Sequence, residues 1–378
     1  MRGARLGVLA ASLSVAIFAA PTPLRAQAPA SDQGKGGTAA TDSKPEQARP
    51  APEPTFKASV QRWFDVQTAS LLARYRRIET SGGIATSNHM QDSVALKVRF
   101  KFDKKGNYTI NGGAATGSSF TGGWNNAGWG TGGDRVMAFY LKQLYLGAVP
   151  VKGLDLSFGG VGILRGESTE ITSYDNDGYL MGERVSVKRK TQLYFDEIAF
   201  TNAYLGDVSA PDVFNRFRRL DEPNYRQFLV SKKVASWLGA SGDYTRLSGV
   251  GTVRATVTAK TPGAHVIDLV RYEQYKRLGT TAAYGFAAYG EKTLVKRVAI
   301  GAGYADIDAK YGGLNADRFN KGRRWFTQDT DKITRDLSAS FFMTKAVHNA
   351  FAVTNGTRVD VVVTYNVLTA LQGAGILR

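Results

Sequence analysis

Hydrophobic and charged residues alternate along several stretches of the chain. In Ser93–Asp103, a hydrophobic residue at every second position is separated from the next by one of three cations, Lys97, Arg99 and Lys101. Successive side chains of a strand point to opposite faces, so this pattern predicts a strand with one apolar face and one basic face. Which of the two faces meets water depends on the rest of the chain.

Amphipathic runs of this kind recur, with no long helical pattern between them. We count about sixteen runs of about ten residues, separated by turn signals, which is the size class of large membrane barrels. The runs predicted to rise from one side are Ala69–Thr80, Asn107–Gly117, Gly153–Gly166, Leu193–Gly206, Leu238–Leu247, His265–Lys276, Arg297–Asp308 and Arg335–Val347. Those predicted to return are Val94–Phe102, Arg135–Val149, Glu183–Lys190, Arg226–Lys233, Thr252–Lys260, Ala282–Glu291, Arg323–Asp331 and Arg358–Thr369.

The connections between these runs are of two alternating kinds. One set is short, as in Asp103–Asn107 and Pro150–Gly153, whereas several of the other set are long and polar or rich in glycine, as in Ser81–Asp92, Ser118–Asp134 and Glu167–Gly182. Short turns at one rim and longer loops at the other are typical of a transmembrane antiparallel β-barrel, with both termini on the periplasmic side. A soluble all-β barrel or sandwich is the alternative, but it would place bulky apolar residues inside. The side chains opposite the apolar positions here are small or polar, so we expect Val98, Phe100 and Phe102 to face lipid and the cations between them to line water.

The first 58 residues are predicted to lie outside the barrel. Residues 1–26 combine two early arginines, an apolar run from Leu6 to Ala20 and small residues near Ala26, which is typical of a cleaved signal peptide. The apolar run is shorter than the roughly 20 residues of a membrane-spanning helix, which disfavours the alternative of an uncleaved anchor. Residues 27–58 are rich in Ala, Pro and polar residues and are predicted to be a disordered periplasmic linker. Residues 59–378 would form the barrel, with a short helix or plug near Ala58–Gln67 before the first strand.

Composition changes the predicted fold little but limits the classes of molecule that the protein is expected to bind. The chain contains no cysteine and has a formal net charge of +17, of which the signal peptide contributes +3 and the linker nothing, so the barrel carries +14. A basic chain of this kind suggests an anionic partner. We expect no nucleic acid, because the protein is predicted to be exported and has no nucleic-acid recognition motif.

In its signal peptide, strand number, loop asymmetry and alternation, the chain resembles the porins of Gram-negative outer membranes over nearly the whole mature sequence. The resemblance implies a water-filled channel in which the third long loop folds into the lumen, carries carboxylates, and faces basic residues on the barrel wall. The candidate constriction loop residues are Glu167, Glu170, Asp175, Asp177 and Glu183. The candidate pore-lining basic residues are Arg74, Arg76, Lys97, Arg99 and Lys101. Opposed charges of this kind bias ion selectivity, although a solvated surface loop would also explain the carboxylates.

The resemblance also implies the function and the partners. We expect passive diffusion of small hydrophilic solutes with a mild preference for anions, in contact with outer-membrane lipid and lipopolysaccharide, and the resemblance suggests a homotrimer. A plugged barrel with a structural or adhesive role is the alternative. One feature departs from porins, which commonly end in an aromatic residue that serves assembly: here the aromatic residue nearest the C-terminus is Tyr365.

Other candidate chemistry is weak. The three histidines, His89, His265 and His348, lack a nearby nucleophile motif, so we expect no enzymatic activity and no catalytic residue. The segment Ser173–Tyr179 resembles part of a calcium loop, but Arg184 stands where the bidentate glutamate belongs, so we expect no metal and no other cofactor. Trp124 and Trp129 could stack on sugars or contact another subunit, or simply lie at the membrane interface.

Overall fold

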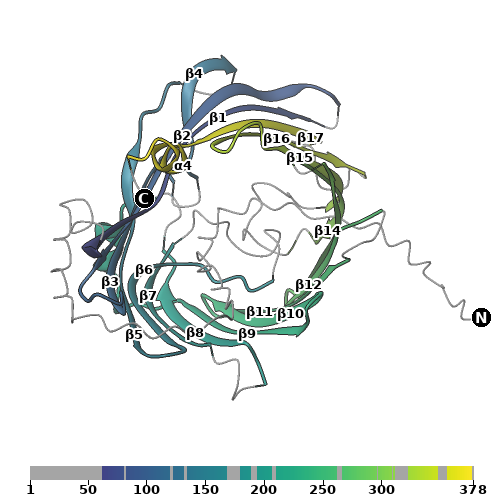
Figure 1. The fold of residues 1–378 in the computed structure, drawn as a ribbon. Helices are drawn as coiled ribbons and strands as arrows, with labels where there is room; N and C mark the ends of the chain where they lie inside the picture. The colour runs from purple at the N-terminus through teal and green to yellow at the C-terminus, as the bar shows by residue number, and fades with distance from the viewer. Residues whose placement is uncertain are drawn as a thin grey trace, which may run out of the picture.

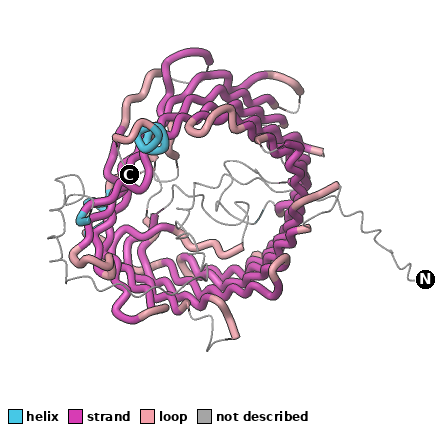
Figure 2. Tube along the Cα trace, in the orientation of Figure 1, coloured by secondary structure: helices cyan, strands magenta, loops and turns pink. Residues whose placement is uncertain are grey.

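The computed structural model describes residues 62–376, except 81, 120–121, 132–133, 168–178, 189–193, 207–209, 262–265, 296, 309, 311–321 and 348–355. These residues form a single antiparallel barrel that is seen end-on as a closed ring (Figure 1). Nearly all of the ring is strand, and the two helices with described bounds lie at its edge (Figure 2). None of the helices in the described ranges is long and apolar enough to cross a membrane.

The elements follow the chain in a simple order. The strands are β1 (Phe64–Glu79), β2 (Ala85–Lys101), β3 (Tyr108–Thr116), β4 (Asn125–Thr131), β5 (Phe139–Val151), β6 (Leu154–Gly162), β7 (Tyr179–Val187), β8 (Glu197–Tyr204), β9 (Tyr225–Ala235), β10 (Leu238–Leu247), β11 (Val250–Lys260), β12 (Leu269–Arg277), β13 (Ala283–Val295), β14 (Val298–Ile307), β15 (Gly322–Asp331), β16 (Leu337–Ala346) and β17 (Thr357–Asn366). The helices are α2 (Val213–Phe217), between β8 and β9, and α4 (Val367–Gly373), after β17.

Sixteen of these strands close the barrel, as the sequence predicts. Each pairs with its neighbour in the chain, and β1 pairs with both β2 and β17, which closes the ring. Strand β4 is the exception: β3 pairs directly with β5, while β4 pairs with the first part of β2 and stands outside the ring (Figure 1). We call the end of the barrel with the β2–β3, β5–β6 and similar turns the short-turn rim, and the opposite end the long-loop rim.

Several predicted boundaries are wrong: β1, for example, begins at Phe64, within the segment predicted as a short helix or plug. Two further boundaries are wrong for identifiable reasons. Strand β2 begins at Ala85, not Val94, so the long loop predicted at Ser81–Asp92 is reduced to a turn. The segment from Ala85 is polar because it pairs with β1 and β4 at the long-loop end, where apolar alternation is not required. At the other terminus β17 ends at Asn366, whose side chain accepts a hydrogen bond from the N–H of Thr369 and so caps α4.

The facing predicted from alternation is confirmed. On β11, Val253 and Val257 are 42% and 43% exposed on the outside, whereas Arg254 and Thr256, at the alternate positions, point inward and are only 4% and 2% exposed. Phe100 and Phe102 on or next to β2 are also exposed on the outside. The barrel is therefore apolar outside and largely polar inside, the reverse of a soluble sandwich.

Aromatic side chains form a continuous row on this outer face. Ring centroids lie 6.3 Å apart for Tyr272 and Phe286, 6.0 Å for Phe286 and Tyr304, and 5.0 Å for Tyr304 and Trp325. These residues occupy four neighbouring strands, β12 to β15. Such a row is typical of the aromatic girdle of a membrane barrel.

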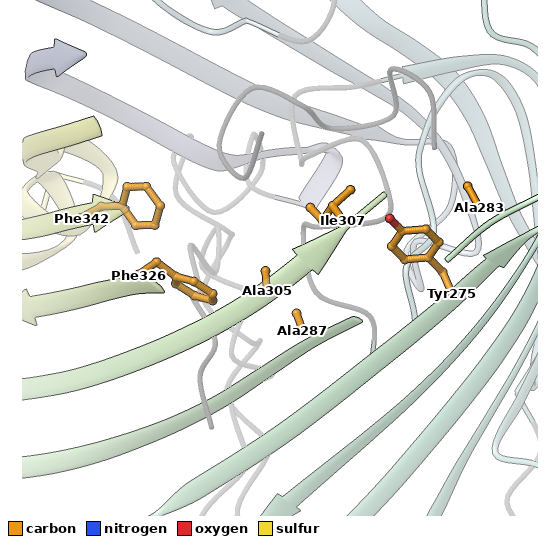
Figure 3. Packing of buried hydrophobic residues seen from close by; sticks show 7 residues of the cluster. All are labelled: Tyr275, Ala283, Ala287, Ala305, Ile307, Phe326 and Phe342. Carbon is orange, nitrogen blue, oxygen red and sulfur yellow. The ribbon is translucent and has the colours of Figure 1, made fainter. Parts of the chain in front are cut away.

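The inner face is less uniformly polar than its sequence predicts. Strands β12 to β16 carry an inward cluster of buried apolar side chains, in register with inward Glu273 and Arg324. Its members are Tyr275, Ala283, Ala287, Ala305, Ile307, Phe326 and Phe342 (Figure 3). One part of the lumen wall is thus apolar although the strands alternate correctly.

Candidate functional site

The lumen wall carries two separate groups of cations. The first lies toward the long-loop rim, where Asp360 of β17 pairs with Arg76 of β1. The Arg76 guanidinium donates two hydrogen bonds to the Asp360 carboxylate, at 2.9 and 3.1 Å, and Arg358 reaches the same carboxylate at 2.6 Å. The Arg74 guanidinium is 3.9 Å from it. One buried carboxylate is therefore shared by three guanidiniums.

Arg74 is held further by side chains of β2 and of the segment before β4. Its guanidinium donates to the amide oxygen of Gln91 at 2.9 and 2.5 Å. The ring of Trp124 lies against it, with the guanidinium carbon 3.9 Å from the ring centroid. Trp124 is thus a contact of the inner wall rather than part of an outer aromatic band. The Arg74 guanidinium over the Trp124 ring forms a cation–π contact, which holds the arginine against the wall.

The second group lies toward the short-turn rim. Lys97, Arg99 and Lys101 occupy alternate positions on the inner face of β2, opposite Gly113, Asn111 and Thr109 of β3. Arg99 donates to the amide oxygen of Asn111 at 3.1 Å, and the Lys101 ammonium is 2.7 Å from the Asp65 carboxylate. The side chains of Lys101 and Asp65 are 21% and 35% exposed, so this pair is more accessible than the one at Asp360.

The five predicted pore-lining cations therefore do not form one cluster. Arg74 pairs across the strands with Gln91, which is six residues from Lys97 along β2. At about 3.4 Å per residue, the two groups are separated by about 20 Å along the strand. Gly113, opposite Lys97, has no side chain, and its place is bordered by the side chains of Gln143 and Lys97.

The predicted acidic loop is described only in part. Glu167 follows β6, and its backbone N–H donates to the hydroxyl of Ser241 on β10 at 2.8 Å. Just before it, the carbonyl of Leu164 accepts from the side chain of Gln227 on β9 at 2.8 Å. Both partners point inward, so residues 163–167 leave the wall at β6 and cross the lumen side to β9 and β10 (Figure 1).

The other predicted loop carboxylates lie elsewhere. Glu170, Asp175 and Asp177 fall outside the described residues, as does the calcium-like segment 173–178. Glu183 lies within β7, opposite Phe158 on the outer face, where its carboxylate accepts from Asn202 at 3.3 Å. Of the five carboxylates, Glu167 is the one seen on the lumen side of the described chain.

Several inward charged residues were not singled out from the sequence. Asp360 and Arg358 organise the first group, and Asp243 on β10 forms a buried ion pair with Arg254 on β11. Gln227 donates to Asp243 at 3.2 Å as well as to Leu164, which connects this pair to the segment 163–167. The signal that could have found them is the alternation itself, because each occupies an inward position of a predicted strand.

The histidine of the described chain takes part in no catalytic arrangement. His89 lies inward on β2, opposite Arg76, and its Nδ1 is 2.8 Å from the hydroxyl of Ser87. Ser87 and His89 lie at alternate positions of the same strand. Among the described contacts, no carboxylate orients the imidazole ring. His265 and His348 fall outside the described residues.

Comparison of the sequence with family models and with curated proteins gives no match. Comparison of the structure with solved structures matches bacterial porins. A mutant of the Rh. blastica porin superposes with a TM-score of 0.50 at 10% identity, over 80% of this chain and 100% of that chain. Salmonella typhi OmpF, solved in complex with daunomycin, superposes with a TM-score of 0.51 at 11% identity, over 80% of this chain and 97% of that chain. The fold of this protein is therefore a porin-like β-barrel.

Proposed function

We propose that this protein is an outer-membrane porin, a water-filled channel for the passive diffusion of small hydrophilic solutes with a mild preference for anions. The observation that carries the proposal is the lumen wall of a closed barrel of sixteen strands, in which Lys97 and Arg99 remain partly exposed on the inside. Barrels of this strand number leave an aqueous channel. The outward apolar face and its aromatic row support insertion in a membrane.

The proposed anion preference follows from the charges on the lumen wall. The second group carries three cations against Asp65, and the barrel as a whole carries +14. Charges in a narrow channel act on permeating ions more strongly than charges on an open surface. Glu167 on the facing wall opposes this preference, which is why we expect it to be mild.

The short-turn rim is proposed to face the periplasm and the long-loop rim the outside, with residues 1–26 removed as a signal peptide and 27–58 forming a periplasmic linker. A homotrimer is part of the proposal. It is supported by exposed apolar side chains around β4 and the start of β5, where Trp129, Met137 and Phe139 are 64%, 80% and 56% exposed. Chemical crosslinking in detergent, with Trp129→Ser and Met137→Ser as interface variants, tests this part.

A plugged barrel with a structural or adhesive role is the second candidate. One observation favours it: the inward apolar cluster of β12 to β16 is almost fully buried, with Phe342 1% exposed. Apolar side chains buried on an inner wall reduce the space left for water.

Planar-bilayer recording separates these functions. Folded protein extracted in detergent should give stepwise conductance increments on insertion, and a salt gradient should give a zero-current potential of the sign expected for anions. Gel migration that changes on heating would show that the protein is folded. Folded protein that gives no conductance steps would contradict the porin proposal and favour the plugged barrel. Conductance steps with a cation-selective zero-current potential would support the channel but contradict the proposed anion preference.

A further inference from the structure

A polar row crosses the outer face of the barrel near the long-loop rim. It consists of Glu183 on β7, Asn202 on β8, Arg226 on β9 and Arg246 on β10, each directly opposite the next across the strands. Asn202 donates to Glu183 at 3.3 Å and accepts from Arg226 at 3.3 Å. The row therefore runs from one carboxylate to two adjacent arginines.

The two arginines are directly opposed like charges. Arg226 and Arg246 are an antiparallel cross-strand pair, and both side chains are exposed. Like charges directly opposite each other on a sheet are destabilising. Among the described residues no carboxylate lies within ion-pair distance of either guanidinium, and Glu183 reaches Arg226 only through Asn202. Within the described residues, the repulsion of this pair is thus left uncompensated.

The pair lies where the apolar outer surface ends. Phe228 and Tyr244 are also directly opposed, two residues further from the long-loop rim on the same strands, and are 48% and 41% exposed on the outer face. Gly251 of β11, opposite Arg246, has no side chain. Lys276 of β12, opposite Val253 and so at the level of Tyr244, adds an exposed cation, with its ammonium 5.3 Å from the centroid of the Tyr284 ring. Aromatic residues of this kind lie at the headgroup level of a bilayer, so the two arginines fall at the depth of lipid phosphates.

We propose that Arg226 and Arg246 bind a phosphate group on the headgroup of an outer-leaflet glycolipid. Arginines at directly opposed positions of neighbouring strands offer several N–H donors that match phosphate oxygens, and an anion bound to both offsets their repulsion. Lys276, two strands from Arg246, contributes further positive charge to the same part of the outer face. The inference rests on the proposed outer-membrane location with the long-loop rim outward, but not on conduction through the lumen.

The matched control is Arg323 of β15. It is exposed on the outer face at the same rim, but its guanidinium is 3.2 Å from the Asp306 carboxylate, so its charge is already compensated. Replacing it removes one cation from the same rim without touching the opposed pair.

The experiment measures binding of a bisphosphorylated glucosamine glycolipid (lipid A) and its dephosphorylated form to the purified full-length mature protein, by native mass spectrometry from detergent. The wild type should retain the phosphorylated form at least tenfold better than the dephosphorylated form. The double variant Arg226→Gln/Arg246→Gln should lose that preference, and Arg323→Gln should keep it. Equal retention of both forms by the wild type, or unchanged preference in the double variant, would overturn the proposal.

A second measurement uses the repulsion itself. In lipid-free detergent, Arg246→Gln should unfold at the same or a higher temperature than the wild type, and the rise in unfolding temperature on adding the phosphorylated glycolipid should disappear. A lower unfolding temperature of Arg246→Gln without lipid would show that the chain already stabilises this arginine, and would contradict the site. Conductance of the same variants, recorded in parallel, should be unchanged, so a failure of the channel proposal is seen separately.

Discussion

The two groups of cations on the lumen wall show how differently the same residue types behave in one barrel. Arg74 and Arg76 are 7% and 8% exposed and share the Asp360 carboxylate with Arg358. Lys97, Arg99 and Lys101 remain partly exposed, and Asp65 is the one carboxylate paired with them in the described structure. The first group is buried in the wall, whereas the second lies on the lumen side of β2 and is more accessible.

The difference indicates that charge on an inner wall serves two separate purposes. A buried carboxylate shared by several guanidiniums ties β17 to β1, where the barrel closes. The partly exposed cations of β2 are less buried and, in the proposed channel, would act on ions in the lumen. We therefore expect variants of the first group to change stability and variants of the second to change selectivity.

The largest effect is expected at the closing seam. Asp360→Asn leaves buried guanidiniums without their shared anion and should lower the free energy of unfolding by about 3–5 kcal/mol, the usual cost of breaking a buried ion pair. Asp65→Asn, at the partly exposed pair, should cost about 1 kcal/mol or less. Urea unfolding in lipid vesicles measures both. Equal losses for the two variants would remove the distinction between the groups.

The segment 163–167 provides the next test. Gln227→Leu removes the donor that holds the Leu164 carbonyl, and leaving that carbonyl unpaired should cost about 1–3 kcal/mol. Because residues 163–167 then lose a hydrogen bond to β9, they should be held less firmly on the lumen side. Single-channel conductance should then rise or become noisier. Gln274→Leu, an exposed outward glutamine of β12, is the matched control and should conduct as the wild type does. The same conductance in both variants would show that the segment does not restrict the channel.

Selectivity should respond to the second group. In unscreened water, removing two cations at about 8 Å raises the energy of a permeating anion by about 1 kcal/mol and lowers that of a cation by about as much. Lys97→Gln/Arg99→Gln should therefore lower the ratio of anion to cation permeability about thirtyfold at low salt. Lys104→Gln/Lys105→Gln removes the same charge from the adjacent turn and should change the ratio less. Zero-current potentials in a salt gradient give both ratios. Equal shifts would place Lys97 and Arg99 no nearer to the ion path than the turn.

The smallest expected effect is that of ionic strength on the unmodified channel. Screening shortens the Debye length from about 10 Å at 0.1 M salt to about 3 Å at 1 M. Anion preference that arises from the partly exposed group should weaken over this range. A preference independent of salt concentration would instead indicate a contact site at a constriction.

Much of the fold could be predicted from the sequence, because alternation with a period of two specifies which face of each strand is apolar. The number of strands and the closed barrel are confirmed. Strand β4 and the early start of β2 were missed, since polar segments that pair beyond the apolar band carry no alternation. The helix α4 was missed because Asn366 acts as a cap only once the strand has ended there.

The candidate site was harder to predict. Sequence could indicate that Arg76 and Lys97 point inward, but not that one lies next to Asp360 from the far end of the chain, 284 residues away. Their separation along the barrel depends on the register between β1 and β2, which sequence does not specify. The apolar cluster around Phe326 and Phe342 was missed for a similar reason: alternation identifies inward positions but not which of them gather.

The central claim is that alternate residues of β2 line a water-filled channel, and cysteine substitution tests it most directly because the chain contains no cysteine. Lys97→Cys, Val98→Cys, Arg99→Cys and Phe100→Cys would each be reconstituted in a planar bilayer and treated with a bulky, charged thiol reagent that does not enter lipid. Stepwise loss of conductance should follow for Lys97→Cys and Arg99→Cys, and none for Val98→Cys and Phe100→Cys. Conductance loss at the two hydrophobic positions instead, or at none of the four, would contradict the account.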